Sequence, residues 1–191
     1  TKVRSEGMDA LLAYAKKFDS LGDDSCLILK KDELKTAFDS LPKEQQELLV
    51  RTANRIKSFA EAQRESISDL EVRIPGGKAG HKVIPVQKAA CYAPGGRFPL
   101  PSSVLMTAIP ARVAGVEEVW VASPKPTEVT IAAAYVAGAD ALLAAGGAQA
   151  VAALSYGVGE IPACNIVVGP GNRYVVAAKQ IVSGDVAIDM L

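Results

Sequence analysis

The chain has 191 residues, of which 49% are hydrophobic, and its 21 basic and 21 acidic side chains give a formal net charge of zero. Such a chain can bury a sizeable core, and the balanced charge argues against nucleic-acid binding, which needs a basic surplus gathered on one face. No apolar run reaches the ~18 residues of a membrane span and the first six residues form no signal core, so we expect a cytoplasmic protein that engages no membrane.

Residues 1–91 are predicted to contain three amphipathic helices. The first covers residues 7–19, the second covers residues 32–41, and the third begins at Pro42, because proline is tolerated in the first turn of a helix. The third helix carries its apolar side chains at helical spacing: Leu49, Ala53, Ile56 and Ala60. Charged residues fill the opposite side, so these helices are expected to pack by one side only.

The segment from residue 70 to residue 90 has a different character. Ile74-Pro75-Gly76-Gly77 is typical of a turn, and Pro85 interrupts an apolar run that would otherwise suit a central strand. The segment is therefore predicted to be an arm or an edge hairpin. His81, the only histidine, lies in it beside a glycine, and we expect a solvated hydrogen-bonding role for it rather than a catalytic one.

From Ala89 onward the sequence is rich in alanine, poor in charge and periodic. Five short apolar runs are predicted to be strands: 89–92, 119–122, 141–145, 166–168 and 186–188. Four helices are predicted between them, near 102–114, 127–138, 148–157 and 172–183. Strands that alternate with helices and lack polar alternation indicate a parallel sheet covered on both faces. The predicted fold class is a doubly wound, Rossmann-like α/β sheet preceded by a helical partial domain.

The loops that follow the strands are the candidate ligand-binding segments, because ligands of open parallel sheets lie outside the carboxyl ends of the strands. Three of the first four loops carry two glycines each: Tyr92-Ala93-Pro94-Gly95-Gly96, Gly146-Gly147-Ala148-Gln149 and Gly169-Pro170-Gly171-Asn172. Glycine lets a ligand approach the backbone N–H groups, and the helix that follows favours an anion such as a pyrophosphate. Glycines are also common wherever a tight turn joins a strand to a helix.

Three side chains in these loops are the candidate cofactor-binding residues. Tyr92 has an apolar ring with a polar tip, suited to packing against a nucleotide, Gln149 lies at the start of a helix, and Asn172 lies where a helix cap is expected. Neither a Gly-x-Gly-x-x-Gly fingerprint nor a P-loop is present. The pattern predicts a site for a ligand that carries phosphate.

The three cysteines, Cys26, Cys91 and Cys164, are odd in number and widely spaced. A disulfide framework or a thiolate zinc site is therefore not expected, and we interpret them as single buried thiols.

In their order along the chain, these segments resemble the histidinol dehydrogenase family. The stretches that carry the resemblance are Gly76-Gly77-Lys78-Ala79-Gly80, Tyr92-Ala93-Pro94-Gly95-Gly96, Pro99-Leu100-Pro101-Ser102-Ser103-Val104-Leu105-Met106, Pro110-Ala111-Arg112-Val113-Ala114-Gly115, Gly146-Gly147-Ala148-Gln149-Ala150, Gly169-Pro170-Gly171-Asn172 and Ala187-Ile188-Asp189-Met190. The likeness extends over nearly all of the chain.

The resemblance implies an oxidoreductase that converts histidinol to histidine, in histidine biosynthesis, through two NAD-dependent hydride transfers. It also implies a homodimer with a zinc ion at each active site, and it places Tyr92, Gln149 and Asn172 against NAD. In this family, residues 1–91 would form the first part of an interrupted α/β domain. Residues 92–191 would form a Rossmann-like nucleotide-binding domain inserted into it.

The resemblance also implies that a catalytic and zinc-binding half is lacking. The family's Gly-Pro-Ser-Glu segment, its Glu-His pair for proton transfer, and its Gln, His, Asp and His zinc ligands have no counterpart here, so no catalytic or metal-binding residue is assigned. We therefore expect this chain by itself to be inactive. Two alternatives remain: a non-catalytic nucleotide-binding fragment, and a paralogous dehydrogenase of another small polar alcohol.

Overall fold

A computed structural model describes residues 2–20, 22, 26–95 and 98–190 of the chain. Its helices are α1 (Lys2–Glu6), α2 (Met8–Asp19), α3 (Lys31–Ser40), α4 (Lys43–Glu65), α5 (Pro101–Val113), α6 (Glu128–Val136), α7 (Gly147–Tyr156) and α8 (Arg173–Val182). Its strands are β1 (Ile28–Lys30), β2 (Leu70–Ile74), β3 (Gly77–His81), β4 (Lys88–Tyr92), β5 (Glu118–Ala122), β6 (Ala141–Leu143), β7 (Ile166–Val168) and β8 (Ala187–Ile188).

The main sheet has the strand order β1-β6-β5-β4-β7-β8. Strands β4 to β8 all pair in parallel, as the sequence predicted. Counted from β4, their order is 3-2-1-4-5, which is the order of the dinucleotide-binding Rossmann sheet. The chain winds away from β4 in one direction through β5 and β6, and in the other direction through β7 and β8. The switch point of the sheet therefore lies between β4 and β7.

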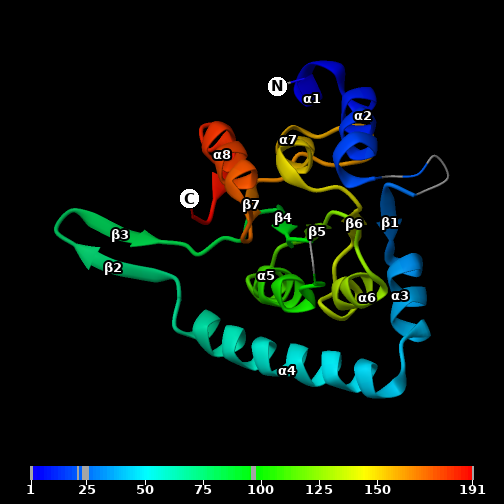
Figure 1. The fold of residues 1–191 in the computed structure, drawn as a ribbon. Coiled ribbons are helices and arrows are strands. Elements are labelled where there is room, and N and C mark those ends of the chain that lie inside the picture. Colours follow the sequence, from blue (N-terminus) through cyan, green and yellow to red (C-terminus); the bar gives the residue numbers. More distant parts are fainter. Residues whose placement is uncertain (1, 21, 23–25, 96–97, 191) are drawn as a thin grey trace.

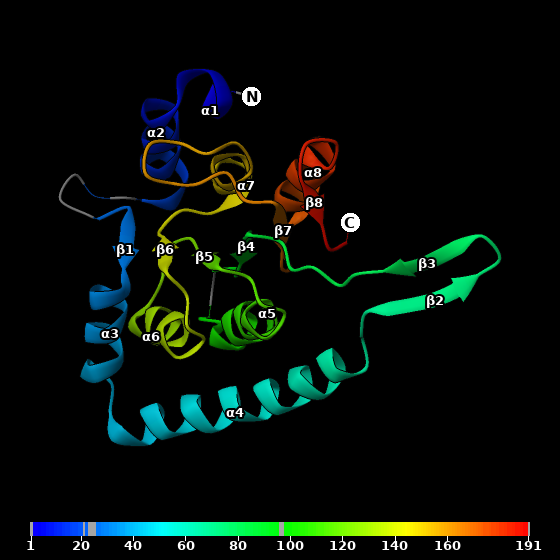
Figure 2. The same ribbon diagram turned by 180° about the vertical axis from the view of Figure 1, so that it is seen from behind.

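Helices cover both faces of this sheet (Figures 1 and 2). One face packs against α5 and α6, with α3 and α4 alongside, and the other packs against α7 and α8, with α1 and α2 alongside. Successive strand residues alternate between the two cores: Cys91 and Val121 belong to the first, whereas Tyr92 and Ala122 belong to the second. The doubly wound α/β fold is thus confirmed.

The sheet also contains an antiparallel strand that the sequence did not predict. Strand β1 pairs with β6 at the sheet edge, with Ile28 opposite Leu143. The three helices predicted within residues 1–91 are present as α2, α3 and α4. Of the apolar stripe on α4, Leu49, Ala53 and Ala60 are buried, and Ile56 is half-buried.

Strands β2 and β3 form an antiparallel hairpin that projects from the body of the molecule beyond the end of α4 (Figure 1). Every residue of the two strands is exposed. The predicted edge hairpin is confirmed, with its turn at Gly76, whose φ of 86° lies in the left-handed region that suits glycine. His81 is exposed, and its Nε2 lies 3.0 Å from the backbone oxygen of Ser68.

The thiols follow the prediction in part. Cys91 and Cys164 are buried, and burial raises the pKa of each thiol to about 12, so neither forms a thiolate at neutral pH. Cys26 is exposed, contrary to the prediction, because it precedes the edge strand β1 rather than lying inside the sheet. None of the helices among the described residues is long and apolar enough to cross a membrane.

Candidate functional site

The candidate residues lie at the carboxyl edge of the sheet, around its switch point. Tyr92 is the last residue of β4, Gln149 lies in the first turn of α7 after β6, and Asn172 follows β7 directly before α8. In open α/β sheets, this crevice beyond the strand ends is where ligands bind. The topology thus brings the three predicted residues to one edge of the sheet.

Tyr92 is a core residue as well as an edge residue. Only 3% of it is exposed, and its hydroxyl accepts a hydrogen bond from the backbone N–H of Gly147 at 3.0 Å. Burial raises the pKa of this phenol, so it stays protonated and its O–H can still donate. The expectation that the ring offers an open face to a nucleotide is not met in this conformation, because the ring packs in the core beneath α7 and α8.

Gln149 is held by Asp19, a residue that the sequence analysis did not identify. The Gln149 Nε2 donates to Asp19 Oδ2 at 3.0 Å, and the same oxygen accepts the backbone N–H of Gly146, also at 3.0 Å. Asp19 is the last residue of α2 and is buried. An acidic side chain at a helix C-terminus is unfavourable with the helix dipole, and this local conflict was the available signal.

Asn172 is the N-cap of α8, as predicted. Its Oδ1 accepts hydrogen bonds from the backbone N–H groups of Tyr174 at 2.9 Å and Val175 at 3.2 Å. The residue is exposed, and within the described part of the chain its Nδ2 has no hydrogen-bond partner. The cap therefore uses one end of the amide and leaves the other end available.

The turn that leads to Asn172 is fixed by an ion pair that the sequence analysis also missed. Lys179 of α8 is 2% exposed, and its Nζ donates to the backbone oxygen of Gly169 at 3.0 Å and pairs with Asp189. Asp189 Oδ2 in turn accepts the backbone N–H of Gly169 at 2.7 Å. Burial pushes the pKa of Asp189 upward, but the hydrogen bonds from Lys179 and from backbone N–H groups outweigh it, and the pKa lies below its ordinary value.

The glycines of these loops serve close packing between loops. A Cβ on Gly146 would lie 2.5 Å from the Cβ of Pro124, and one on Gly169 would lie 2.1 Å from the backbone oxygen of Tyr92. The N–H groups of Gly146, Gly147 and Gly169 already have acceptors in the protein. For these three residues, the expectation of unhindered amides that could bind a pyrophosphate is therefore corrected; Gly96 lies outside the described residues.

Among the described residues, three polar groups at this edge keep a hydrogen-bonding capacity that the protein does not use: the O–H of Tyr92, the Oε1 of Gln149 and the Nδ2 of Asn172. Tyr92 and Gln149 are buried, and Asn172 is exposed. The three groups comprise two donors and one acceptor from three different loops. A few convergent polar groups of this kind fix the orientation of a small ligand in a mostly apolar site. The arrangement can orient a ligand, and no proton-transfer role is assigned to these three groups.

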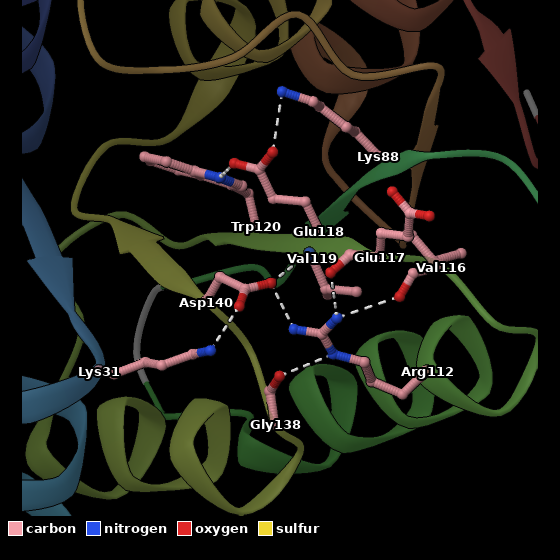
Figure 3. A network of polar contacts seen from close by, with 10 residues as sticks. All are labelled: Lys31, Lys88, Arg112, Val116, Glu117, Glu118, Val119, Trp120, Gly138 and Asp140. Carbon is pink, nitrogen blue, oxygen red and sulfur yellow. Dashed lines mark hydrogen bonds and ion pairs between the residues drawn. The ribbon is translucent and has the colours of Figure 1, made fainter.

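The opposite edge of the sheet carries a structural network (Figure 3). Arg112 of α5 pairs with Asp140 and donates to the backbone oxygen of Gly138 at 2.8 Å. Asp140 also accepts the backbone N–H of Val119 at 2.9 Å and pairs with Lys31 at 2.7 Å. Burial pushes the pKa of Asp140 upward, but hydrogen bonds from these three partners outweigh it and leave the pKa lowered. The network ties α3 and α5 to the amino ends of β5 and β6.

A large hollow lies away from the glycine loops. It is open, has a volume of about 1050 Å³, and lies between α4 and the pair α5 and α6. Ionisable side chains along α4, among them Lys57, Glu61 and Arg64, form much of its wall. Among the described residues, no cluster of three or more His, Cys, Asp or Glu side chains could hold a metal ion.

Comparison with known proteins gives a consistent result. The histidinol dehydrogenase family profile matches residues 1–191. The chain is 46% identical to a histidinol dehydrogenase from Aromatoleum aromaticum, covering 99% of this chain and 44% of the relative, and 44% identical to one from Aquifex aeolicus, covering 100% and 44%. A crystal structure of histidinol dehydrogenase from Elizabethkingia anophelis matches with a TM-score of 0.89 at 31% identity, over 99% of this chain and 45% of that chain. The chain thus spans less than half the length of these relatives.

Proposed function

The chain belongs to the histidinol dehydrogenase family, and from this premise we propose that it is the dinucleotide-binding portion of an enzyme that oxidises histidinol to histidine with NAD. The observation that carries the proposal is the position of Tyr92, Gln149 and Asn172 at one edge, the carboxyl edge, of a Rossmann-ordered sheet. The names of the relatives favour histidinol over another small polar alcohol as the substrate of the whole protein. The cytoplasmic location and the homodimer expected from the sequence are parts of the same proposal.

In this proposal the residues of the chain bind and orient the dinucleotide, and NAD supplies the hydride acceptor. The phenol of Tyr92 and the Nδ2 of Asn172 donate to ligand oxygens, and the Oε1 of Gln149 accepts from a ligand hydroxyl or amide. Asp19 keeps the amide of Gln149 turned so that its oxygen is free. The backbone N–H groups of Gly146, Gly147 and Gly169 have their own acceptors and do not contribute.

We assign no zinc site to the described part of the chain, because no cluster of three or more His, Cys, Asp or Glu side chains occurs there. The proposal for this portion is therefore limited to dinucleotide binding. The chain has a single histidine, which lies in the exposed hairpin. We accordingly keep the prediction that this chain alone does not turn over histidinol, and the division into residues 1–91 and 92–191 remains a proposal about the whole protein.

The test is titration of the purified chain with NADH, followed by nucleotide fluorescence or by calorimetry. We expect Gln149→Ala and Asn172→Ala each to weaken binding about 3- to 10-fold, the loss expected for one hydrogen bond. Asn54→Ala is the matched control, because Asn54 lies on α4 by the hollow, away from the switch point. Equal affinity in all three variants, or no NADH binding by the unaltered chain, would contradict the proposal.

A further inference from the structure

We propose that the ion pair between Lys179 and Asp189 is the positioning device of the switch-point turn, fixing Gly169 from both sides and thereby setting where Asn172 meets the dinucleotide; this inference rests on the proposed function. Neither residue touches the ligand in this proposal. Both act through the backbone of the turn, so they are positioning residues.

The geometry of the pair is unusual in that both of its halves bind the same residue. Lys179 Nζ donates to the Gly169 oxygen at 3.0 Å, and Asp189 Oδ2 accepts the Gly169 N–H at 2.7 Å. Lys179 comes from α8, and Asp189 follows β8, so the two side chains reach the turn from different elements. One ion pair therefore satisfies both backbone polar groups of a single turn residue.

The turn needs such a restraint because Gly169 is in a conformation that other residues rarely adopt. Its φ is +112°, and its Cα is pressed against the end of β4, where an added Cβ would lie 2.1 Å from the Tyr92 oxygen. Asn172 follows only three residues later and caps α8. A shift of Gly169 would therefore move the Asn172 amide relative to Tyr92.

Stability alone does not account for a lysine at this place. Burying an ammonium group costs free energy that its ion pair only partly returns, and apolar residues of similar size are often at least as stable in such positions. Lys179 lies on α8 among buried apolar neighbours such as Val175 and Val182, where a methionine would pack without that cost. What a methionine cannot do is hold the Gly169 oxygen.

The experiment compares Lys179→Met, the double variant Lys179→Met with Asp189→Leu, and a control, Arg112→Met with Asp140→Leu, which removes the ion pair at the opposite edge of the sheet. Each is measured by urea unfolding, by hydrogen exchange of the amides in residues 168–174, and by NADH titration under conditions where circular dichroism shows it folded. We expect Lys179→Met to speed exchange in the turn and to weaken NADH binding, each at least about tenfold. The control variant is expected to be less stable than the unaltered chain, but its hydrogen exchange in the turn and its NADH affinity should be unchanged.

The double variant separates positioning from stability. Removal of both charges should return the urea midpoint towards that of the unaltered chain, because the partly buried carboxylate of Asp189 is no longer left without its partner. Under the proposal, turn exchange stays fast and NADH binding stays weak; recovery of affinity together with stability would overturn it. Unchanged exchange in Lys179→Met would overturn the inference alone, whereas absence of NADH binding by the unaltered chain would overturn the proposed function and the ligand part of the inference with it.

Discussion

Side-chain oxygen atoms accept hydrogen bonds from backbone N–H groups of the glycine loops; these oxygens belong to Asp19, Tyr92 and Asp189. They occupy positions in which an anionic ligand would otherwise bind. A phosphate oxygen at these amides would have to displace an oxygen that the protein itself supplies. These three amides are therefore already occupied, and the proposed site is assigned side-chain groups for recognition instead. In the usual glycine-rich phosphate loop, by contrast, backbone N–H groups bind the phosphate directly.

Asn172 has two roles that a pair of substitutions can separate. Asn172→Asp keeps an oxygen to cap α8 and puts a negative charge at a helix N-terminus, so the free energy of unfolding should be unchanged or slightly higher. It also removes the Nδ2 donor and repels phosphate, so NADH affinity should fall. Asn172→Ala loses the cap as well, and we expect it to lower the free energy of unfolding by about 1 kcal/mol.

Urea unfolding and NADH titration of the two variants check this prediction. If Asn172→Asp bound NADH as well as the unaltered chain does, the residue would be a cap and nothing more.

How much of the site could be predicted depends on the sequence distance over which each residue acts. The cap role of Asn172 follows from its own neighbours, which the sequence displays. Asp19 binds groups more than 120 residues away, and Lys179 acts on a turn whose other restraint, Asp189, directly follows strand β8. Such contacts exist only once the sheet has formed, so local patterns could not reveal them.

The contrast between local sequence signals and long-range contacts also explains which helices and strands could be predicted. The five parallel strands carry apolar runs that stand out between helices, and all five were predicted. Strand β1 has only three residues and passes directly into α3, so its strand character comes from pairing with β6 rather than from its own sequence. Because β1 joins this sheet, the helices of residues 1–91 are attached to the parallel sheet rather than separate from it.

Two adjacent leucines test how α4 is held. Leu49 is 6% exposed and packs in the core shared with α5, whereas its neighbour Leu48 is 51% exposed. We expect Leu49→Ala to lower the free energy of unfolding by about 2–3 kcal/mol through lost burial and the cavity left behind. Leu48→Ala should change it by less than about 0.5 kcal/mol. Urea unfolding measures both, and equal effects would show that α4 does not pack as described.

The Asp140 network predicts a pH dependence of stability. A carboxyl whose pKa is lowered by folding stabilises the protein above its unfolded pKa, and this contribution is lost as the pH falls through the folded pKa. Asp140 has such a lowered pKa. Asp140→Asn should therefore be less stable than the unaltered chain at neutral pH, and the difference should shrink below about pH 4, the ordinary range of aspartate.

Urea unfolding at a series of pH values from 7 to 3 checks this. Asp189 also has a lowered pKa, but it is present in both proteins and its contribution cancels in the difference. The charge of Asp140 raises the pKa of Glu118, as the weakest of the influences on that carboxyl, so the difference contains this smaller effect as well. A difference that stays constant down to pH 3 would contradict the assignment to Asp140.

At the scale of the whole molecule, the segments before and after the hairpin are held together by strand pairing and helix packing as well as by the backbone. Before it, β1 is paired into the sheet, α3 packs on α6, α4 packs on α5, and α1 and α2 pack on α7. The hairpin adds no residue to either core. The covalent link between the two parts therefore runs through a piece of structure that contributes nothing to their packing.

A protease site placed in the turn at Gly76 should thus cut the chain without separating it. We expect the two pieces to elute together in size-exclusion chromatography under native conditions and to come apart in urea. Separate elution without denaturant would contradict the packing of β1 and α3 described above.

The intact hairpin then acts as a tether that keeps two complementary pieces at high effective concentration. Once it is cut, folding becomes bimolecular, and the midpoint of unfolding should rise with protein concentration, as it does for an obligate heterodimer. The continuity of the backbone at this arm determines the molecularity of folding, and the shape of the folded state does not depend on it.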